Sequence, residues 1–380
     1  MEHNLLYPDK IVFGTDCLLD LTQILPENAA VLLVTGKSAL KNGLADRLRI
    51  LLKDFKVIDA CGIAVPEPPL ECVDKLITLG REGGATAVVG AGGGSAIDTA
   101  KAAAAIIPAG GMTADYFSEK REITEKGLFF AAVPTTAGTG AEITKNSVLT
   151  DSENKVKKSI RSPFMVPDAA IVDPVLTLDL PPSVTAASGM DAFTQALESF
   201  TSSSANDVTK PLAKSAVAAI FANIRDVYRN GKDLEKRKAM AEASLMSAMA
   251  FSQSGLGAVH GLAHPVGSLL NVPHGVACSI LLTPVMEWNA SECTEEYAEL
   301  ARAVLDPEAA ALDDIALTHL FIADVSRLCR DLDIPANFAD YGLKEEHFPF
   351  IVRNCRSRSM ECNPRPMSDE DVTDILLKLI

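Results

Sequence analysis

The stretch Ala85–Lys101, ATAVVGAGGGSAIDTAK, decides how the first half of the chain is interpreted. It opens with a short apolar run, passes through three consecutive glycines at 92–94, and ends in an alanine-rich segment of helical character. Glycine lets a ligand approach the backbone closely, and the unpaired N–H groups at the start of a helix attract anions. The pattern therefore predicts a strand, a tight turn and a helix that together bind a phosphate or pyrophosphate.

Two better-known phosphate loops differ from this one. Ser95 stands where the last glycine of GxGxxG would be, and no GK[ST] follows, so neither the usual dinucleotide fingerprint nor a Walker A loop is present. A tight turn that binds nothing is the alternative interpretation. The glycines follow an apolar strand at its carboxyl end, which favours phosphate binding, because open α/β sheets bind ligands there.

The same alternation of strand and helix extends over the first half of the chain. Apolar runs predict strands at 30–35, 56–64, 85–89, 128–133 and 169–172, and apolar residues at helical spacing predict helices at 44–55, 73–80 and 95–107. Apolar strands that alternate with helices indicate a parallel sheet covered on both faces. The predicted fold class is therefore α/β, with an N-terminal Rossmann-like domain that binds a nucleotide.

Beyond Leu180-Pro181-Pro182 the apolar residues recur at intervals of three and four. This spacing is typical of helices, and it continues to the end of the chain. The two prolines mark the change. We therefore expect two domains, at 1–180 and 181–380, of which the second is all helical.

Composition excludes several partners. The 380 residues carry 35 Lys and Arg against 50 Asp and Glu, a net charge of −15. This charge disfavours binding to nucleic acid or to an anionic membrane surface, and we expect neither partner. The start, Met1-Glu2-His3-Asn4, has no basic segment before an apolar core, and the eight cysteines form no CxxC pair. We expect no signal peptide, reduced thiols and a cytoplasmic location.

A second loop of small polar residues follows the predicted strand at 128–133. Thr135, Thr136 and Thr139 supply three hydroxyl groups, and Gly138 and Gly140 add little bulk. Such a loop suits the oxygens of ribose and pyrophosphate. Its place at the carboxyl end of another strand favours this role over that of a polar loop without a ligand.

The end of the predicted strand at 30–35 bears on the choice of cofactor. NAD-specific sites usually place a carboxylate at such a strand end, where it binds the ribose 2′-hydroxyl. Here the residues are Gly36, Lys37 and Ser38, and none is acidic. This leaves room for a 2′-phosphate with Lys37 and Ser38 as partners, so we predict NADP(H) in preference to NAD(H).

Three of the six histidines cluster in the second half of the chain, at His260, His264 and His274. His260 and His264 are one helical turn apart, so both lie on one helix face. Imidazole is a common ligand of divalent metals. The spacing is not that of the protease motif HExxH, because Gly261 stands where the glutamate would be.

An acidic partner for these histidines is present on an earlier predicted helix. Asp191 and Gln195 are also one turn apart. Either residue alone is more often a cap or a satisfied polar group. Together with the clustered histidines, an aspartate and an amide oxygen predict a metal site that draws on two helices.

These segments together resemble the iron-containing (group III) alcohol dehydrogenases, which share their fold with glycerol dehydrogenase and dehydroquinate synthase. The similarity covers nearly the whole chain, and it rests on residues 92–101, 134–144, 170–174, 189–198 and 260–275. It implies a nucleotide-binding α/β domain and a helical metal-binding domain with the active site in the cleft between them. It also implies a homodimer or a larger homo-oligomer.

The resemblance assigns roles to individual residues. Asp191, His260 and His274 would hold one divalent metal, Fe²⁺ or Zn²⁺, with Gln195 at a place where the family usually has histidine. His264 corresponds to the residue that relays the proton. The implied cofactor-binding residues are Gly93, Gly94, Ser95, Asp98, Thr135, Thr136, Thr139 and Lys157, and Gly36 lies where NAD-using members often carry aspartate.

The activity implied is transfer of a hydride between NAD(P)(H) and a small alcohol or aldehyde. Two alternatives keep the fold but change the chemistry: a lyase related to dehydroquinate synthase, and a reductase that needs no metal. The lyase requires a basic pocket, and no dense Lys/Arg cluster lies beside the histidine segment. The metal-free reductase is suggested by Gln195. A non-catalytic protein that binds a nucleotide or a metal is the third alternative.

Overall fold

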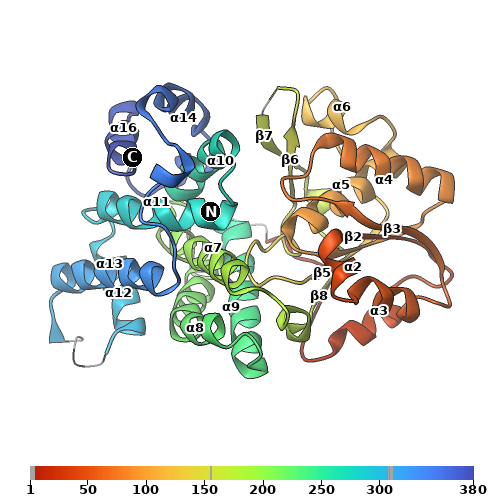
Figure 1. Cartoon of the computed structure of the whole chain (residues 1–380), viewed down its shortest axis with the longest axis horizontal. Helices are drawn as coiled ribbons and strands as arrows, with labels where there is room; N and C mark the ends of the chain where they lie inside the picture. The colour runs from red at the N-terminus through yellow and green to blue at the C-terminus, as the bar shows by residue number, and fades with distance from the viewer. Residues whose placement is uncertain (1–4, 155, 307, 309–310) are drawn as a thin grey trace. The chain divides into compact units, whose positions relative to one another are not determined.

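The computed structural model describes residues 5–154, 156–306, 308 and 311–380 (Figure 1). The chain divides into two compact units, Met1–Asp179 and Leu180–Ile380, one residue from the boundary expected from the sequence. Residues 1–4, on which the signal-peptide prediction rests, lie outside the described part of the chain. Among the described residues, no helix is both long and apolar enough to cross a membrane.

A parallel sheet of six strands forms the centre of the first unit. Its strands, in spatial order, are β1 (Lys10–Phe13), β8 (Ala169–Val172), β5 (Phe129–Pro134), β4 (Ala87–Gly92), β2 (Ala30–Gly36) and β3 (Lys56–Ala64). In parallel strands the carboxyl ends lie at one edge. The register pairs Thr35 with Ala91 and Gly92 with Pro134, so the ends of β2, β4 and β5 are neighbours.

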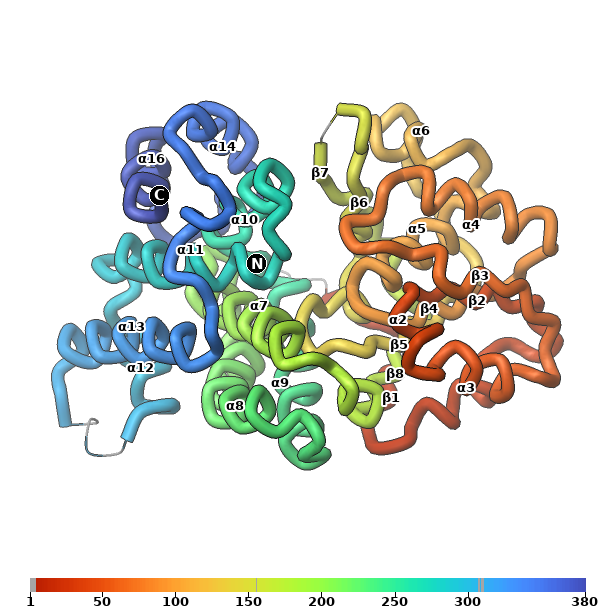
Figure 2. The backbone as a smooth tube through the Cα atoms, in the orientation of Figure 1, coloured from red at the N-terminus to blue at the C-terminus, as the bar shows by residue number. Residues whose placement is uncertain are grey.

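Helices cover both faces of this sheet (Figures 1 and 2). Leu32 and Val34 of β2 are buried in a core with α4 (Leu70–Gly83) and α5 (Gly94–Ala109). The alternate residues of the same strand belong to the opposite core, which includes α3 (Leu44–Leu51). Successive side chains of a strand point to opposite faces, so a strand covered on both faces is apolar throughout. The predicted parallel sheet is thus confirmed.

The sequence did not reveal β1 or a small antiparallel hairpin of β6 (Asn146–Asp151) and β7 (Val156–Arg161). β7 reads VKKSIR, whose charges conceal the alternation of a strand. The side chain of Lys101 joins α5 to this hairpin and to the loop before it. Its Nζ donates hydrogen bonds of 2.7 Å to the carbonyl oxygens of Ala141, Thr144 and Asn146.

The second unit consists of helices, and its described residues include no strand, as predicted. Its main helices are α7 (Pro182–Thr201), α8 (Thr209–Arg229), α9 (Leu234–Ser254), α10 (Ala258–Leu270), α11 (His274–Asn289), α12 (Thr294–Val304) and α13 (Asp314–Asp331). The shorter α14 (Phe348–Asn354), α15 (Arg358–Glu361) and α16 (Asp369–Leu377) follow. α7 packs against α8, α9 and α11, and every residue from Gly189 to Thr201 is buried.

Short segments complete both units. The first unit also contains α1 (Leu21–Ile24), α2 (Lys37–Lys41) and α6 (Thr113–Phe117). Single 3₁₀ turns occur at Cys17–Asp20, Pro163–Met165, Pro174–Thr177, Ala339–Tyr341 and Glu345–His347.

Candidate metal and cofactor sites

Four side chains of the second unit bring possible metal-binding atoms together. They are Asp191 of α7, His260 of α10, and His274 and Cys278 of α11, and their ligand atoms all lie within 4.8 Å of one another. His260 Nε2 lies 3.4 Å and His274 Nε2 3.7 Å from Asp191 Oδ1. Three of these residues are among those predicted from the sequence, and Cys278 is not.

The donor atoms of this cluster suit a divalent cation. Asp191 and His260 are each 2% exposed and Gln195 is 3% exposed. Asp191 Oδ1, Gln195 Oε1 and His260 Nε2 have no hydrogen-bond partner within the described part of the chain. A buried polar atom without a partner costs about 1–3 kcal/mol. Carboxylate, amide and imidazole lone pairs that share one buried place are satisfied together by a cation.

Glu198, one turn beyond Gln195 on α7, fixes the orientation of His260. Its Oε2 lies 2.6 Å from His260 Nδ1, and its Oε1 accepts a 2.7 Å hydrogen bond from the Val259 backbone N–H. A carboxylate only accepts hydrogen bonds, so Nδ1 carries the imidazole proton. The lone pair of Nε2 is then available on the side of Asp191.

The electrostatic surroundings of His260 favour positive charge. Burial alone would lower the pKa of its imidazole, but neighbouring Cys278, Glu198 and Asp191 raise that pKa well above its ordinary value. A cluster of anionic groups in a buried place stabilises either a proton or a metal cation there.

Two local features bring the helices together at this site. Gly275 follows His274 at the start of α11, and a Cβ built on it would lie 2.1 Å from the carbonyl oxygen of Ala187 on α7. Only glycine permits this approach. At the start of α10, the side chain of Asn363 accepts a 3.0 Å hydrogen bond from the backbone N–H of Ala258. The first contact brings the start of α11 against α7, and the second fixes the start of α10.

His264 lies beside the cluster. Its ring stacks on the ring of His274, with 5.2 Å between centroids and 16° between planes, while the ring of His260 lies 5.4 Å from His274 on a tilted plane. His264 is partly exposed, in contrast to buried His260. The structure thus brings the three predicted histidines together. His260 and His274 contribute to the four converging ligand atoms, whereas His264 does not.

Sequence reasoning missed Cys278 and Glu198, although both follow the spacing that identified the other residues. Cys278 is four residues after His274, the interval that relates Gln195 to Asp191. Glu198 is seven residues after Asp191, so it lies on the same helix face. The helical spacing therefore places both residues beside the predicted ones, but their residue types alone do not mark them as parts of a metal site.

In the first unit, the glycine turn and the threonine loop lie against each other. The Thr135 N–H donates a 2.9 Å hydrogen bond to the Gly92 carbonyl, and a Cβ built on Gly94 would lie 2.6 Å from Thr139 Oγ1. Thr136 approaches Gly93 in the same way, at 3.6 Å. Gly93 is the N-cap residue of α5, because the helix begins at Gly94.

The end of β2, which is predicted to contact the nucleotide ribose, lies at the same edge of the sheet as the glycine turn. Gly36 ends β2, next to β4, and Lys37 and Ser38 begin α2 with exposed side chains. Ser95 lies in the first turn of α5 and is partly exposed. These predicted cofactor residues are therefore accessible to a ligand.

Asp98 and Lys157 have partners within the protein. Asp98 Oδ2 accepts a 3.0 Å hydrogen bond from the Val148 backbone N–H, and Lys101 Nζ lies 3.8 Å from its other oxygen. Burial raises the pKa of Asp98 to about 6 despite the charge of Lys101. Lys157 forms an ion pair with Glu67. These contacts indicate that Asp98 and Lys157 first of all anchor the hairpin of β6 and β7.

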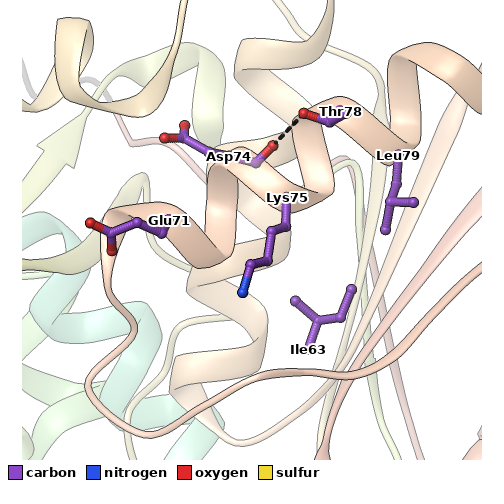
Figure 3. A pocket seen from close by; sticks show the side chains of 6 residues that line it. All are labelled: Ile63, Glu71, Asp74, Lys75, Thr78 and Leu79. Carbon is purple, nitrogen blue, oxygen red and sulfur yellow. Dashed lines mark hydrogen bonds between the residues drawn. The ribbon is translucent and has the colours of Figure 1, made fainter.

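A shallow hollow on the first unit contains none of the predicted site residues (Figure 3). It is lined by Ile63, Glu71, Asp74, Lys75, Thr78 and Leu79. Two of its polar groups already have partners, since Thr78 donates to the Asp74 carbonyl and Asp74 Oδ1 accepts from Thr113. We therefore do not assign a ligand to this hollow.

Comparison with known protein families matches both units. The profile described as iron-containing alcohol dehydrogenase matches residues 8–174. The profile described as the C-terminal part of the Fe-containing alcohol dehydrogenase family matches residues 185–380. Together they cover nearly the whole chain, and the break between them falls at the boundary between the two units.

Individual relatives agree with these profiles. The chain is 33% identical over 350 residues to long-chain-alcohol dehydrogenase 1 of Geobacillus thermodenitrificans, covering 91% of this chain and 88% of the relative. The crystal structure of a 1,3-propanediol oxidoreductase matches with a TM-score of 0.94 and 31% identity, and each chain is covered completely. Sulfoacetaldehyde reductase from Bifidobacterium kashiwanohense, solved in complex with NAD⁺, matches with a TM-score of 0.90 and 30% identity over 100% of this chain and 99% of that one.

Proposed function

This chain belongs to the iron-containing alcohol dehydrogenase family and oxidises alcohols or reduces aldehydes with a nicotinamide cofactor, and from that premise we propose which of its residues perform the reaction. We infer that Asp191, His260 and His274 hold one divalent cation, with Gln195 as a further oxygen donor. The observation that carries this assignment is the group of buried donor atoms in the second unit that lack hydrogen-bond partners among the described residues.

The residues around the cation have separate roles in the proposed reaction. When bound, the cation supplies Lewis acidity toward the substrate oxygen, and the nicotinamide donates or accepts the hydride. Asp191 contributes negative charge, and Glu198 keeps the Nε2 lone pair of His260 directed to the site. The complete burial of α7 around Asp191 keeps bulk water from the carboxylate.

We assign the movement of the proton to His264. A ring nitrogen of His264 would accept the proton of an alcohol during oxidation and return a proton during aldehyde reduction. Two observations support this role: the ring stacks on His274, and the side chain is partly exposed, which gives it access to both the site and solvent. An imidazole changes its charge near neutral pH and so suits this exchange.

The cofactor is assigned to the carboxyl ends of β2, β4 and β5. The start of α5 and the backbone of Gly93, Gly94 and Ser95 offer N–H groups to the pyrophosphate. Thr136 and Thr139, which lie against the two glycines, offer hydroxyl groups beside them. Asp98, Thr135 and Lys157 are assigned to positions around these cofactor-binding residues. We further propose a preference for NADP(H), because Gly36, Lys37 and Ser38 at the end of β2 include no carboxylate.

The metal assignment is tested by metal analysis and turnover measured on the same preparations. Asp191→Ala and His260→Ala should each lose bound metal together with alcohol and aldehyde turnover. Full turnover by protein freed of metal would refute the assignment and would support the metal-independent reductase. A matched control is Asp173→Ala. Among the described residues, this buried carboxylate of the first unit accepts hydrogen bonds only from backbone N–H groups. If folded, the variant should keep its metal.

The cofactor proposal is tested by comparing kcat/KM for NADPH and NADH with a short aldehyde. A Lys37→Ala variant should lose rate with NADPH but not with NADH, because only the 2′-phosphate meets this side chain. One charged hydrogen bond is worth about 1.5–3 kcal/mol, so the loss should be about 10- to 150-fold. A clear preference of the unaltered enzyme for NADH would overturn the proposal.

We also propose a cellular location and an oligomeric state for the protein. The eight cysteines form no disulfide in the described residues, which supports a reducing, cytoplasmic environment. We propose a homodimer or a larger homo-oligomer, which sedimentation of the purified protein tests directly.

A further inference from the structure

We propose that Cys278 is a ligand of the same cation, so that the site is an Asp-His-His-Cys set containing one thiolate. This inference rests on the metal site proposed above and adds a ligand of different chemistry. When the sulfur–metal bond forms, the thiol proton leaves to solvent and no electron is transferred. The set then consists of Asp191, His260, His274 and Cys278.

Three separations between the four ligand atoms are close to those expected for ligands of one metal ion. Metal–ligand bonds of about 2.0–2.1 Å to N or O and about 2.3 Å to S place N and O about 3.4 Å apart, and N and S about 3.6 Å apart. Here His260 Nε2 lies 3.4 Å from Asp191 Oδ1, and Cys278 Sγ lies 3.7 Å from His274 Nε2. His274 Nε2 lies 3.7 Å from Asp191 Oδ1. All four ligand atoms lie within 4.8 Å of one another, so small shifts of the side chains would bring them around one cation.

The thiol of Cys278 has surroundings that differ from those of other cysteines in the chain. Those of Cys17, Cys72 and Cys355 donate to backbone carbonyl oxygens, as small core residues do. Cys278 is fully buried, and its sulfur faces the Nε2 atom of His274 one turn earlier on α11. Asp191 Oδ1 and His260 Nε2, both buried and lacking hydrogen-bond partners among the described residues, converge on the same place.

A thiolate changes which metal the site prefers. Soft sulfur ligands favour Zn²⁺ over harder ions, and nitrogen and sulfur donors bind Zn²⁺ more tightly than Fe²⁺ in the usual order of affinities. A site with a thiolate also depends less on the neutral oxygen of Gln195. We therefore expect the protein to retain zinc in preference to iron when both are offered at equal concentration.

Cobalt substitution tests the ligand directly. Protein stripped of metal and loaded with Co²⁺ should bind one ion per chain and show an intense sulfur-to-cobalt charge-transfer absorption in the near ultraviolet. Cys278→Ser should bind cobalt without this band. Cys355→Ser is the matched control, because this buried thiol of the same unit donates to the Val352 carbonyl and a serine hydroxyl can do the same. The control should keep the band.

The outcomes separate this inference from the metal site itself. Cobalt bound by the wild type without the band, or a band that persists in Cys278→Ser, would overturn the cysteine ligand and leave the metal site standing. Failure of the wild type to bind cobalt or zinc would overturn the metal site. If Cys278→Ser does not fold, zinc X-ray absorption on the wild type decides, since a zinc–sulfur distance of about 2.3 Å is expected. A spectrum with only nitrogen and oxygen neighbours would refute the proposal.

Discussion

Replacing Glu198 by Gln should weaken metal binding although Glu198 does not belong to the ligand set. The two carboxylate oxygens accept one hydrogen bond each, from His260 Nδ1 and from the Val259 backbone N–H. Glutamine offers one acceptor oxygen and an NH₂ group. One of the two donors must then face another donor, unless the imidazole moves its proton to Nε2, where it would point at the cation.

Either outcome removes a charge-assisted hydrogen bond worth about 1.5–3 kcal/mol. Loss of such a supporting partner typically lowers metal affinity by about 10- to 100-fold, which is about 1.4–2.8 kcal/mol. The two figures agree, so we expect Glu198→Gln to bind zinc about 10- to 100-fold more weakly. Competition with a chromophoric chelator measures this affinity on the folded protein.

The matched control is Glu142→Gln, which neutralises a buried glutamate of the first unit, 3% exposed, and should bind zinc like the wild type. Circular dichroism establishes that both variants are folded. A folded Glu198→Gln protein whose zinc affinity lies within a factor of about 2 of the wild type would refute the reasoning. His260 would then be oriented by its packing and not by the carboxylate.

Three further predictions concern other parts of the molecule. Gly275→Ala places a methyl carbon 2.1 Å from the Ala187 carbonyl oxygen. The free energy of unfolding, measured in urea, should therefore fall by about 1–3 kcal/mol, and the variant should bind less metal. An unchanged urea midpoint would contradict the close approach. His264→Ala should lower kcat while metal content stays near that of the wild type, and a wild-type kcat would exclude it from proton transfer. Burial raises the pKa of Glu142 from 4.5 to about 7, so the folded state binds its proton more tightly and the resulting stability, fully present below pH 4.5, is lost as pH rises through 7. That loss is of the order of 3 kcal/mol, and urea midpoints of Glu142→Gln should therefore fall less than those of the wild type between about pH 5 and pH 8; parallel curves would refute the shift.

Regular patterns in the sequence predicted most of the fold. β2, apolar throughout because both of its faces are covered, and helices such as α10 with repeated spacing were identified from residue type alone. β7 was missed because its side chains are charged, and β1 because a strand of four residues provides too short a pattern. Such strands are fixed by their neighbours in the sheet, which the local sequence does not specify.

The candidate metal site was predicted to the extent that spacing along one helix reveals it. The histidines stood out because three of six cluster within fifteen residues, and Asp191 because Gln195 lies one turn away. The resemblance to the family then assigned Asp191, His260 and His274 as ligands. Cys278 follows the same interval, but cysteine is usually a core residue, so its type alone gave no signal. Its role depends on α7 and α11 meeting at Gly275, a contact between helices that no spacing within one helix records.

The buried side chain of Lys101 holds the segment that follows the proposed cofactor loop. Lys101 Nζ is held by three carbonyl oxygens of the segment 141–146, so this part of the chain is already ordered in the free protein. Ordering a side chain on binding costs about 0.5–1.5 kcal/mol, and a segment ordered in advance avoids that entropy loss. We therefore expect nucleotide affinity to depend on Lys101, although this lysine is not among the residues that we propose to contact the nucleotide.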